Sequence, residues 1–537
     1  MVKKIATFIV FCNVFLLFAQ QKNVLPPEIQ TILEYVRISP DCTLEYVEKL
    51  ETELLKFYSD DDYVFFRINK RKVGFAFSSG DYVKALEYLD KAKLILKKHT
   101  AYDDSDAAET EEDYGILFVY LGDTDKGKEH FEKAITITKK VYGPLSTELT
   151  EMCKAIAELY YRIADYDHVL EYSGYALDTS KKLLGEKHPD IAKLYNIMGF
   201  VYCRKGDYEK ALKCYGEELD IQRNVLGEEH PDTVTTYNVI GYIHYATGDY
   251  GKAIENYSSA LSIQKKVFGE DCPDTATSYT NIGFVYHIKG DFAHALEYYS
   301  RALDIRKKVL GDEHPDTVES YDNIGLVFYD KGDFAHALEY YSCALDIRKK
   351  VQGDENSDTA KSYSNIGVVY DAKGDYDKSL EYHIQALNIR KKVFGEEHPD
   401  TAESYNNIGF AYHAKGDFDH ALAYYSKALN IRKKILGEEH LDTATSYNNI
   451  GGLYHALGDY NHALEYYIRA VDVVKEVLGE EHPNIARSYG NIGGVYQSKG
   501  DYDHALEYHL RALDIQKKIL GEKHPDTATS YNNIGGL

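Results

Sequence analysis

The 537-residue chain contains no tryptophan and only 11 prolines, 7 cysteines and 3 methionines. So few prolines exclude a low-complexity chain, and 44% hydrophobic with 28% charged residues is normal for a folded protein. The cysteines form no C-x-x-C pair and no regular framework, which argues against a zinc site and a disulfide scaffold. No H-E-x-x-H motif occurs either, so we expect no bound metal.

Basic side chains are in the minority. The chain has 62 lysines and arginines against 86 acidic residues, which gives a formal charge of -24. Phosphates would be repelled by this charge, so we expect no nucleic-acid partner. The chain also lacks a G-x-G-x-x-G motif, a P-loop and a G-x-S-x-G element. We therefore expect neither an enzyme nor a cofactor.

Long hydrophobic runs are missing except at the N-terminus, where Lys3 and Lys4 precede an apolar run from Ile5 to Ala19. This order is typical of a secretory signal peptide, and the run is shorter than the ~20 residues that a spanning helix needs. We expect residues 1–20 to be a signal peptide or a short anchor. The protein would then be secreted or periplasmic and would touch a membrane only through this segment, with a cytoplasmic location as the alternative.

A period of 42 residues dominates the rest of the chain. Gly-Asp-Tyr or Gly-Asp-Phe recurs at this interval, starting at Gly206, Gly248, Gly290, Gly332, Gly374, Gly416, Gly458 and Gly500. A fixed period in this range is the signature of a solenoid, in which each unit buries its apolar face against its neighbours.

One unit illustrates the expected structure. Apolar residues recur at helical spacing over 275–289, which predicts a first helix, called helix A. Gly290 and Asp291 should end it and cap a second helix, helix B, over 292–310. The basic run at 306–308 would oppose the negative end of the helix B dipole, and Gly311 would end that helix.

The segments LEYYSRALDIRKKVLGDEHPDT, from Leu296, and LAYYSKALNIRKKILGEEHLDT, from Leu422, identify a repeat type. They resemble the 42-residue tetratricopeptide repeats of kinesin light chains and related arrays. This resemblance implies an all-α fold, an α-solenoid in which tandem helix-turn-helix repeats form a right-handed superhelix. It also implies a protein-interaction scaffold that binds peptide segments of partner proteins in its concave groove.

Counting backward by 42 residues places the start of the array near Asp62. We expect residues 21–61 to form a helical N-terminal cap or a degenerate repeat, and residues 62–537 to form the array, which stops within a helix A. Two other functions stay open. The repeats could be the sensory module of a signalling enzyme, such as a receptor kinase, with its catalytic part beyond Leu537, or a motor-cargo adaptor like kinesin light chain.

An asparagine ladder precedes the Ile-Gly pair of successive helices A. It comprises Asn281, Asn323, Asn365, Asn407, Asn449, Asn491 and Asn533. The family resemblance implies that this position faces the concave groove, where amides can pair with the backbone of an extended peptide. The alternative is that each asparagine bonds a neighbouring helix and only fixes the repeat geometry.

Two further rows of helix A vary between repeats, as ligand-selecting positions should. They place Tyr245, Phe284, His287, Tyr329, Phe410 and His413 among the candidate groove residues. Aromatic anchors in the N-terminal half of the array, together with Gly452 and Gly494 in the C-terminal half, suggest an apolar pocket near the middle, although unselected drift between copies would also explain the variation. The recurrent His-Pro-Asp of the linkers is interpreted as a structural turn, with proline in the first helical turn.

Overall fold

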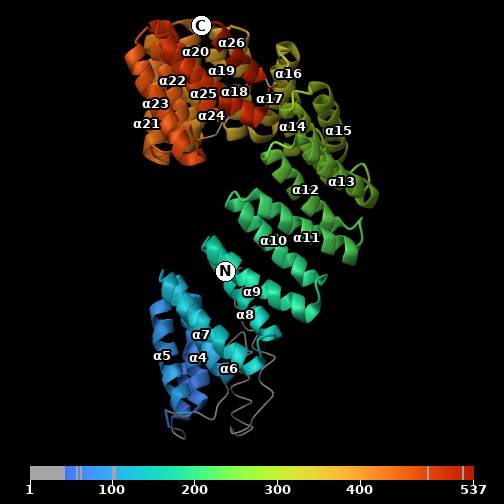
Figure 1. The fold of residues 1–537 in the computed structure, drawn as a ribbon, viewed down its shortest axis with the longest axis vertical. Coiled ribbons are helices and arrows are strands. Elements are labelled where there is room, and N and C mark those ends of the chain that lie inside the picture. The colour runs from blue at the N-terminus through green and yellow to red at the C-terminus, as the bar shows by residue number, and fades with distance from the viewer. Residues whose placement is uncertain (1–42, 56–58, 61–62, 100–103, 481–482, 523–524) are drawn as a thin grey trace. The chain divides into compact units, whose positions relative to one another are not determined.

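The computed structural model describes residues 43–55, 59–60, 63–99, 104–480, 483–522 and 525–537. The expected signal peptide at 1–20 and most of the expected cap at 21–61 lie outside these ranges. Both stay predictions. Within the described residues every regular element is an α-helix, and consecutive helices pack as antiparallel A and B pairs (Figure 1). The expected α-solenoid of paired helices is confirmed.

The chain divides into two compact units, residues 1–228 and 229–537. The helices of the first unit are α3 (Leu44–Leu54), α4 (Tyr63–Ser79), α5 (Tyr82–Lys98), α6 (Asp104–Tyr120), α7 (Thr124–Tyr142), α8 (Thr147–Arg162), α9 (Tyr166–Leu184), α10 (Pro189–Arg204) and α11 (Tyr208–Leu226). Its core includes Tyr160, Tyr172 and Ile191, all nearly inaccessible to solvent.

The second unit repeats the same pair seven times and ends with a further helix A. Its helices are α12 (Pro231–Ala246), α13 (Tyr250–Phe268), α14 (Pro273–Ile288), α15 (Phe292–Leu310), α16 (Pro315–Asp330), α17 (Phe334–Gln352), α18 (Ser357–Ala372), α19 (Tyr376–Phe394), α20 (Pro399–Lys415), α21 (Phe418–Leu436), α22 (Leu441–Ala456), α23 (Tyr460–Leu478), α24 (Pro483–Lys499), α25 (Tyr502–Leu520) and α26 (Pro525–Gly535).

The turn from helix A to helix B follows the expected chemistry. In the repeat of α14 and α15, Gly290 has a φ of 76° and donates its N–H to the carbonyl of His287. The Asp291 carboxylate then accepts the backbone N–H of His294 and caps α15. Helix B has the predicted bounds, because both of its ends are set by local glycine and aspartate chemistry.

Helix A begins two residues earlier than predicted, at Pro273 instead of Thr275. Proline occupies the first helical position, where its missing N–H removes no hydrogen bond. The linker histidine has a role that the sequence did not suggest. Nδ1 of His314 accepts the backbone N–H of Asp316 at 3.2 Å and so caps α16, and His398 does the same for α20.

The core of the second unit is a continuous ribbon between the two helix layers. Small residues such as Ala295 and Ala302 let the helices approach closely, and Tyr299 fills the space between them. Ile324 and Val327 of the next helix A cover the same side chains. Each repeat therefore completes the core of the repeat before it.

Ala164 occupies the turn position that is glycine in the later repeats, and it has a φ of 60°. A β-carbon in this left-handed conformation costs roughly 1–2 kcal/mol. We therefore expect Ala164→Gly to raise the free energy of unfolding by about 1 kcal/mol, measured by urea denaturation. Gly206→Ala should act in the opposite direction, because Gly206 has a φ of 75°. Nothing lies within 4 Å of the added carbon, so the effect would come from the backbone conformation alone. Equal effects of the two changes would contradict this account.

Candidate functional site

Helices A of neighbouring repeats contact one another directly from α18 to α24. Helix α18 packs on α20, α20 on α22, and α22 on α24. Equivalent positions of these helices therefore form continuous rows. We call the surface that carries the ladder asparagines Asn281 to Asn533 the ladder face.

All seven ladder asparagines are half-buried. Nδ2 of Asn449 donates to Oδ1 of Asn406 on the preceding helix A at 2.7 Å, which is the bond that the structural alternative requires. Across the described part of the chain, no other ladder asparagine has a side-chain hydrogen bond. The other amides therefore keep both their donors and their acceptor for solvent or a ligand.

The predicted aromatic residues lie on the same helices. Phe284 and Phe410 are 39% and 49% exposed. Tyr245 is half-buried, and its ring packs edge-on against Phe284 of the next helix A, with centroids 5.1 Å apart. Tyr329 is also half-buried, and its ring centroid lies 5.9 Å from that of Phe334. The structure therefore joins the two variable rows into one aromatic surface between α12 and α14.

The two predicted histidines differ from each other. His287 is only 7% exposed, and its Nε2 lies 2.6 Å from the Asp330 carboxylate on the next helix A, so it is not open to a ligand. His413 is half-buried against Phe418, and burial lowers the pKa of His413. A β-carbon placed on Gly452 would lie 4.0 Å from the His413 ring, so this glycine lies beside the imidazole.

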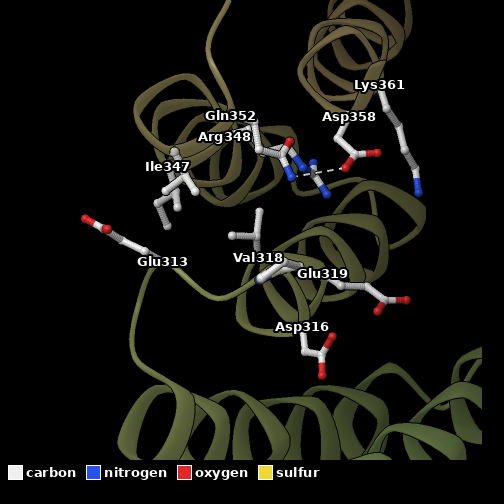
Figure 2. A pocket seen from close by; sticks show the side chains of 11 residues that line it. Glu313, Asp316, Val318, Glu319, Ile347, Arg348, Gln352, Asp358 and Lys361 are labelled. Carbon is white, nitrogen blue, oxygen red and sulfur yellow. Dashed lines mark hydrogen bonds between the residues drawn. The ribbon is translucent and has the colours of Figure 1, made fainter. Parts of the chain in front are cut away.

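A hollow of about 210 Å³ lies away from the ladder face, between the start of α16, the end of α17 and the start of α18 (Figure 2). Val318 and Ile347 supply apolar walls, and Nε2 of Gln352 donates to the Asp358 carboxylate at 3.2 Å. Gln352 replaces the leucine or phenylalanine that the other repeats of the second unit carry at this position. None of the predicted site residues lines this hollow.

Sequence reasoning missed a row of buried arginines. The run at 306–308 was interpreted as a partner of the helix dipole, but Arg306 is only 5% exposed and donates to the Ser320 hydroxyl at 2.8 Å. Burial lowers the pKa of Arg306. The same arginine–serine pair, fourteen residues apart, joins helix B to the next helix A at Arg348, Arg390 and Arg432. That constant spacing was the available signal.

Arg348 alone of these arginines also bonds a carboxylate of the helix A of its own repeat. Its Nη2 donates to Asp322 at 2.6 Å, and both side chains are 9% exposed. Within the described ranges, no group of three or more metal-ligating side chains converges. No helix there is both long enough and apolar enough to cross a membrane.

Comparison with known proteins agrees with this geometry. The tetratricopeptide repeat profile matches overlapping stretches at residues 190–266, 238–308, 274–350, 358–434, 404–473, 442–518 and 484–537. The chain belongs to the tetratricopeptide repeat family. The linker sequences of its 42-residue repeats resemble those of kinesin light chains.

Three solved structures illustrate what the chain is similar to. BtubC from P. vanneervenii is 26% identical, with a TM-score of 0.37 over 44% of this chain and 94% of that one. The kinesin light chain repeats of Podosopora anserina are 23% identical, with a TM-score of 0.33 over 38% and 98%. The quorum sensor NprR from B. thuringiensis is 15% identical, with a TM-score of 0.44 over 68% and 99%. A search of curated proteins found no match.

Proposed function

We propose that this tetratricopeptide repeat protein is a non-enzymatic interaction scaffold that binds an extended peptide segment of a partner protein along the ladder face. The observation that carries the proposal is the row of half-buried asparagines without side-chain partners, of which Asn365 and Asn407 lie on adjacent helices A. An amide held in this way can donate to and accept from a peptide backbone whatever the side chains of the ligand.

The exposed rings beside the ladder would select the ligand. Phe284 and Phe410 offer apolar surface, whereas the ladder amides offer bonds that do not depend on the ligand sequence. Burying an aromatic anchor contributes more to affinity than most other contacts, so these rings would prefer a bulky apolar side chain. His287, which is buried and paired with Asp330, is left out of the proposed contact surface.

The Asn365→Ala/Asn407→Ala double variant tests the ladder. Peptides would first be selected from a random displayed library on the full chain, and their affinity would then be measured by fluorescence anisotropy. We expect the double variant to bind about tenfold more weakly, since each lost hydrogen bond costs about 0.5–1.5 kcal/mol. Its circular dichroism should be unchanged.

A matched control is Asn461→Ala, which removes an exposed asparagine from the first turn of α23, a helix B. This variant should bind the selected peptides as the wild type does. Equal affinity of the double variant and the wild type would exclude the ladder as the binding surface. Equal losses in the double variant and the control would show that the peptides bind elsewhere.

A further inference from the structure

Five repeats of the second unit carry a histidine at the third residue of helix B. In each of them Nδ1 lies 2.6–2.8 Å from the carboxylate of the aspartate that caps the helix. The imidazole also stacks on a tyrosine or phenylalanine of helix A, with ring centroids 4.9–5.1 Å apart. The side chain thus joins the two helices across their turn. These histidine turns contain His294, His336, His420, His462 and His504.

Two other repeats of this unit have lysine at the same position. Nζ of Lys252 lies 3.0 Å from the capping Asp249, and Nζ of Lys378 lies 3.3 Å from Asp375. Lys378 also lies over the Tyr370 ring, 5.1 Å from its centroid. Lysine and histidine both donate a hydrogen bond, and they share a positive charge when the imidazole is protonated, so this position favours a donor that can carry a positive charge.

The first unit shows the same alternation between lysine and histidine at this position. Its turns contain Lys126 and Lys210, each 2.7 Å from the capping aspartate and 5.4–5.5 Å from an aromatic centroid of helix A. His168 takes the equivalent place in a third repeat, 2.7 Å from Asp165 and stacked on Tyr160. Lysine keeps its charge throughout the physiological range, whereas an ordinary histidine titrates near pH 6.5.

The charges around two of the histidine turns, those of His462 and His504, favour protonation. The hydrogen bond and the charge of Asp459 raise the pKa of His462, and Glu465 of the same helix acts in the same direction. Asp501 raises the pKa of His504 in the same way, with Glu507 and Asp503 adding to it. From helix A, each turn faces the aromatic ring and, in four repeats, a lysine near the aspartate: Lys289, Lys331, Lys415 and Lys499.

We propose that the histidine turns at His462 and His504 are a pH-sensitive device, which holds the helix pairs α22–α23 and α24–α25 together most firmly in mildly acidic surroundings and loosens them as the pH rises. For His462 and His504 the folded pKa exceeds the unfolded value. Their contribution to stability is therefore complete below about pH 6.5 and is lost as the pH rises through the folded pKa. The lysine turns keep their contribution over the whole range.

The test compares the full-length wild type with a variant in which His462 and His504 are replaced by lysine. Urea unfolding would be followed by circular dichroism at pH 5.5 and pH 8.0. We expect the folded-to-unfolded ratio of the wild type to fall about threefold, relative to the variant, between these two values, because solvent weakens ion pairs at exposed turns. The comparison cancels the effects of His413, His455 and His509, whose pKa values are lowered by burial and act in the opposite direction.

A further variant keeps the test decisive. Replacing His462 and His504 by glutamine should reduce stability at pH 5.5 and leave it unchanged at pH 8.0, and this variant applies even if the lysine variant does not fold. A lysine variant with the pH profile of the wild type would overturn the proposal, as would a glutamine variant with that profile. Neither result would affect the peptide-binding proposal, because these turns contain no ladder asparagine.

Discussion

Replacing Tyr425 by alanine is expected to lower the free energy of unfolding by about 3–5 kcal/mol, the usual cost of removing a large buried ring. Tyr425 is 1% exposed on α21, and its ring lies against the backbone of α20. A β-carbon built on Gly409 would come within 2.7 Å of that ring, which shows how little space the helices leave around it. Alanine would leave a cavity that this close backbone contact cannot fill.

The loss should be concentrated in the repeat of α20 and α21, since each unit of a solenoid contacts only its neighbours. Hydrogen exchange of the amides in these two helices, together with urea unfolding, would measure it. Tyr502→Ala provides the control, because Tyr502 is 58% exposed and its loss should change stability by no more than about 0.5 kcal/mol. Similar effects of the two changes would show that the ring at 425 does not support the core.

The adjacent glycines of α24 should respond to alanine with opposite signs. The β-carbon of Gly493→Ala would come within 2.7 Å of the His509 ring, which is 2% exposed, so we expect a loss of about 1–3 kcal/mol from overpacking. At Gly494 the nearest atom is 3.9 Å away, on His455. Gly494→Ala should therefore stabilise the helix by about 0.5–1 kcal/mol, the ordinary advantage of alanine over glycine.

Each glycine variant serves as the control for the other, because the two residues lie on the same helix and undergo the same substitution. Thermal and urea unfolding of the two variants would give the comparison directly. A gain in stability from both changes would mean that the buried His509 ring can move aside. A loss of stability from both changes would mean that Gly494, on the more exposed face of the helix next to the ladder, also lacks space for a β-carbon.

Most of the fold could be predicted because the information is local and repeated. Helix B of the repeat at 292–310 begins after an aspartate cap and ends at a glycine, and both signals are readable within a few residues. The 42-residue period then transfers the same assignment to every copy. The structure starts helix A two residues earlier than the prediction, because Pro273 and Asp274 already belong to the helix, and the N-cap residue Cys272 gives no side-chain signal there.

The candidate site could be predicted only in part. The period indicated which asparagines share a row, but whether an amide is bonded depends on the neighbouring helix, as the pair of Asn449 and Asn406 shows. His287 and His413 are equivalent in sequence, yet the first is buried because Asp330 lies opposite it. Groove binding by the ladder and the aromatic residues stays a prediction.

The sequence by itself determined the repeat length, the all-helical pairs, their turns and the family, because helix caps and a strict period act over short distances along the chain. Only the tertiary structure decided which polar side chains are buried in the core. It buried Arg306 and its equivalents against serines fourteen residues away, and it stacked the histidine turns on aromatic rings of the preceding helix. Those outcomes depend on how two helices face each other, and pairing between helices is set by packing, not by the order of residues within either one.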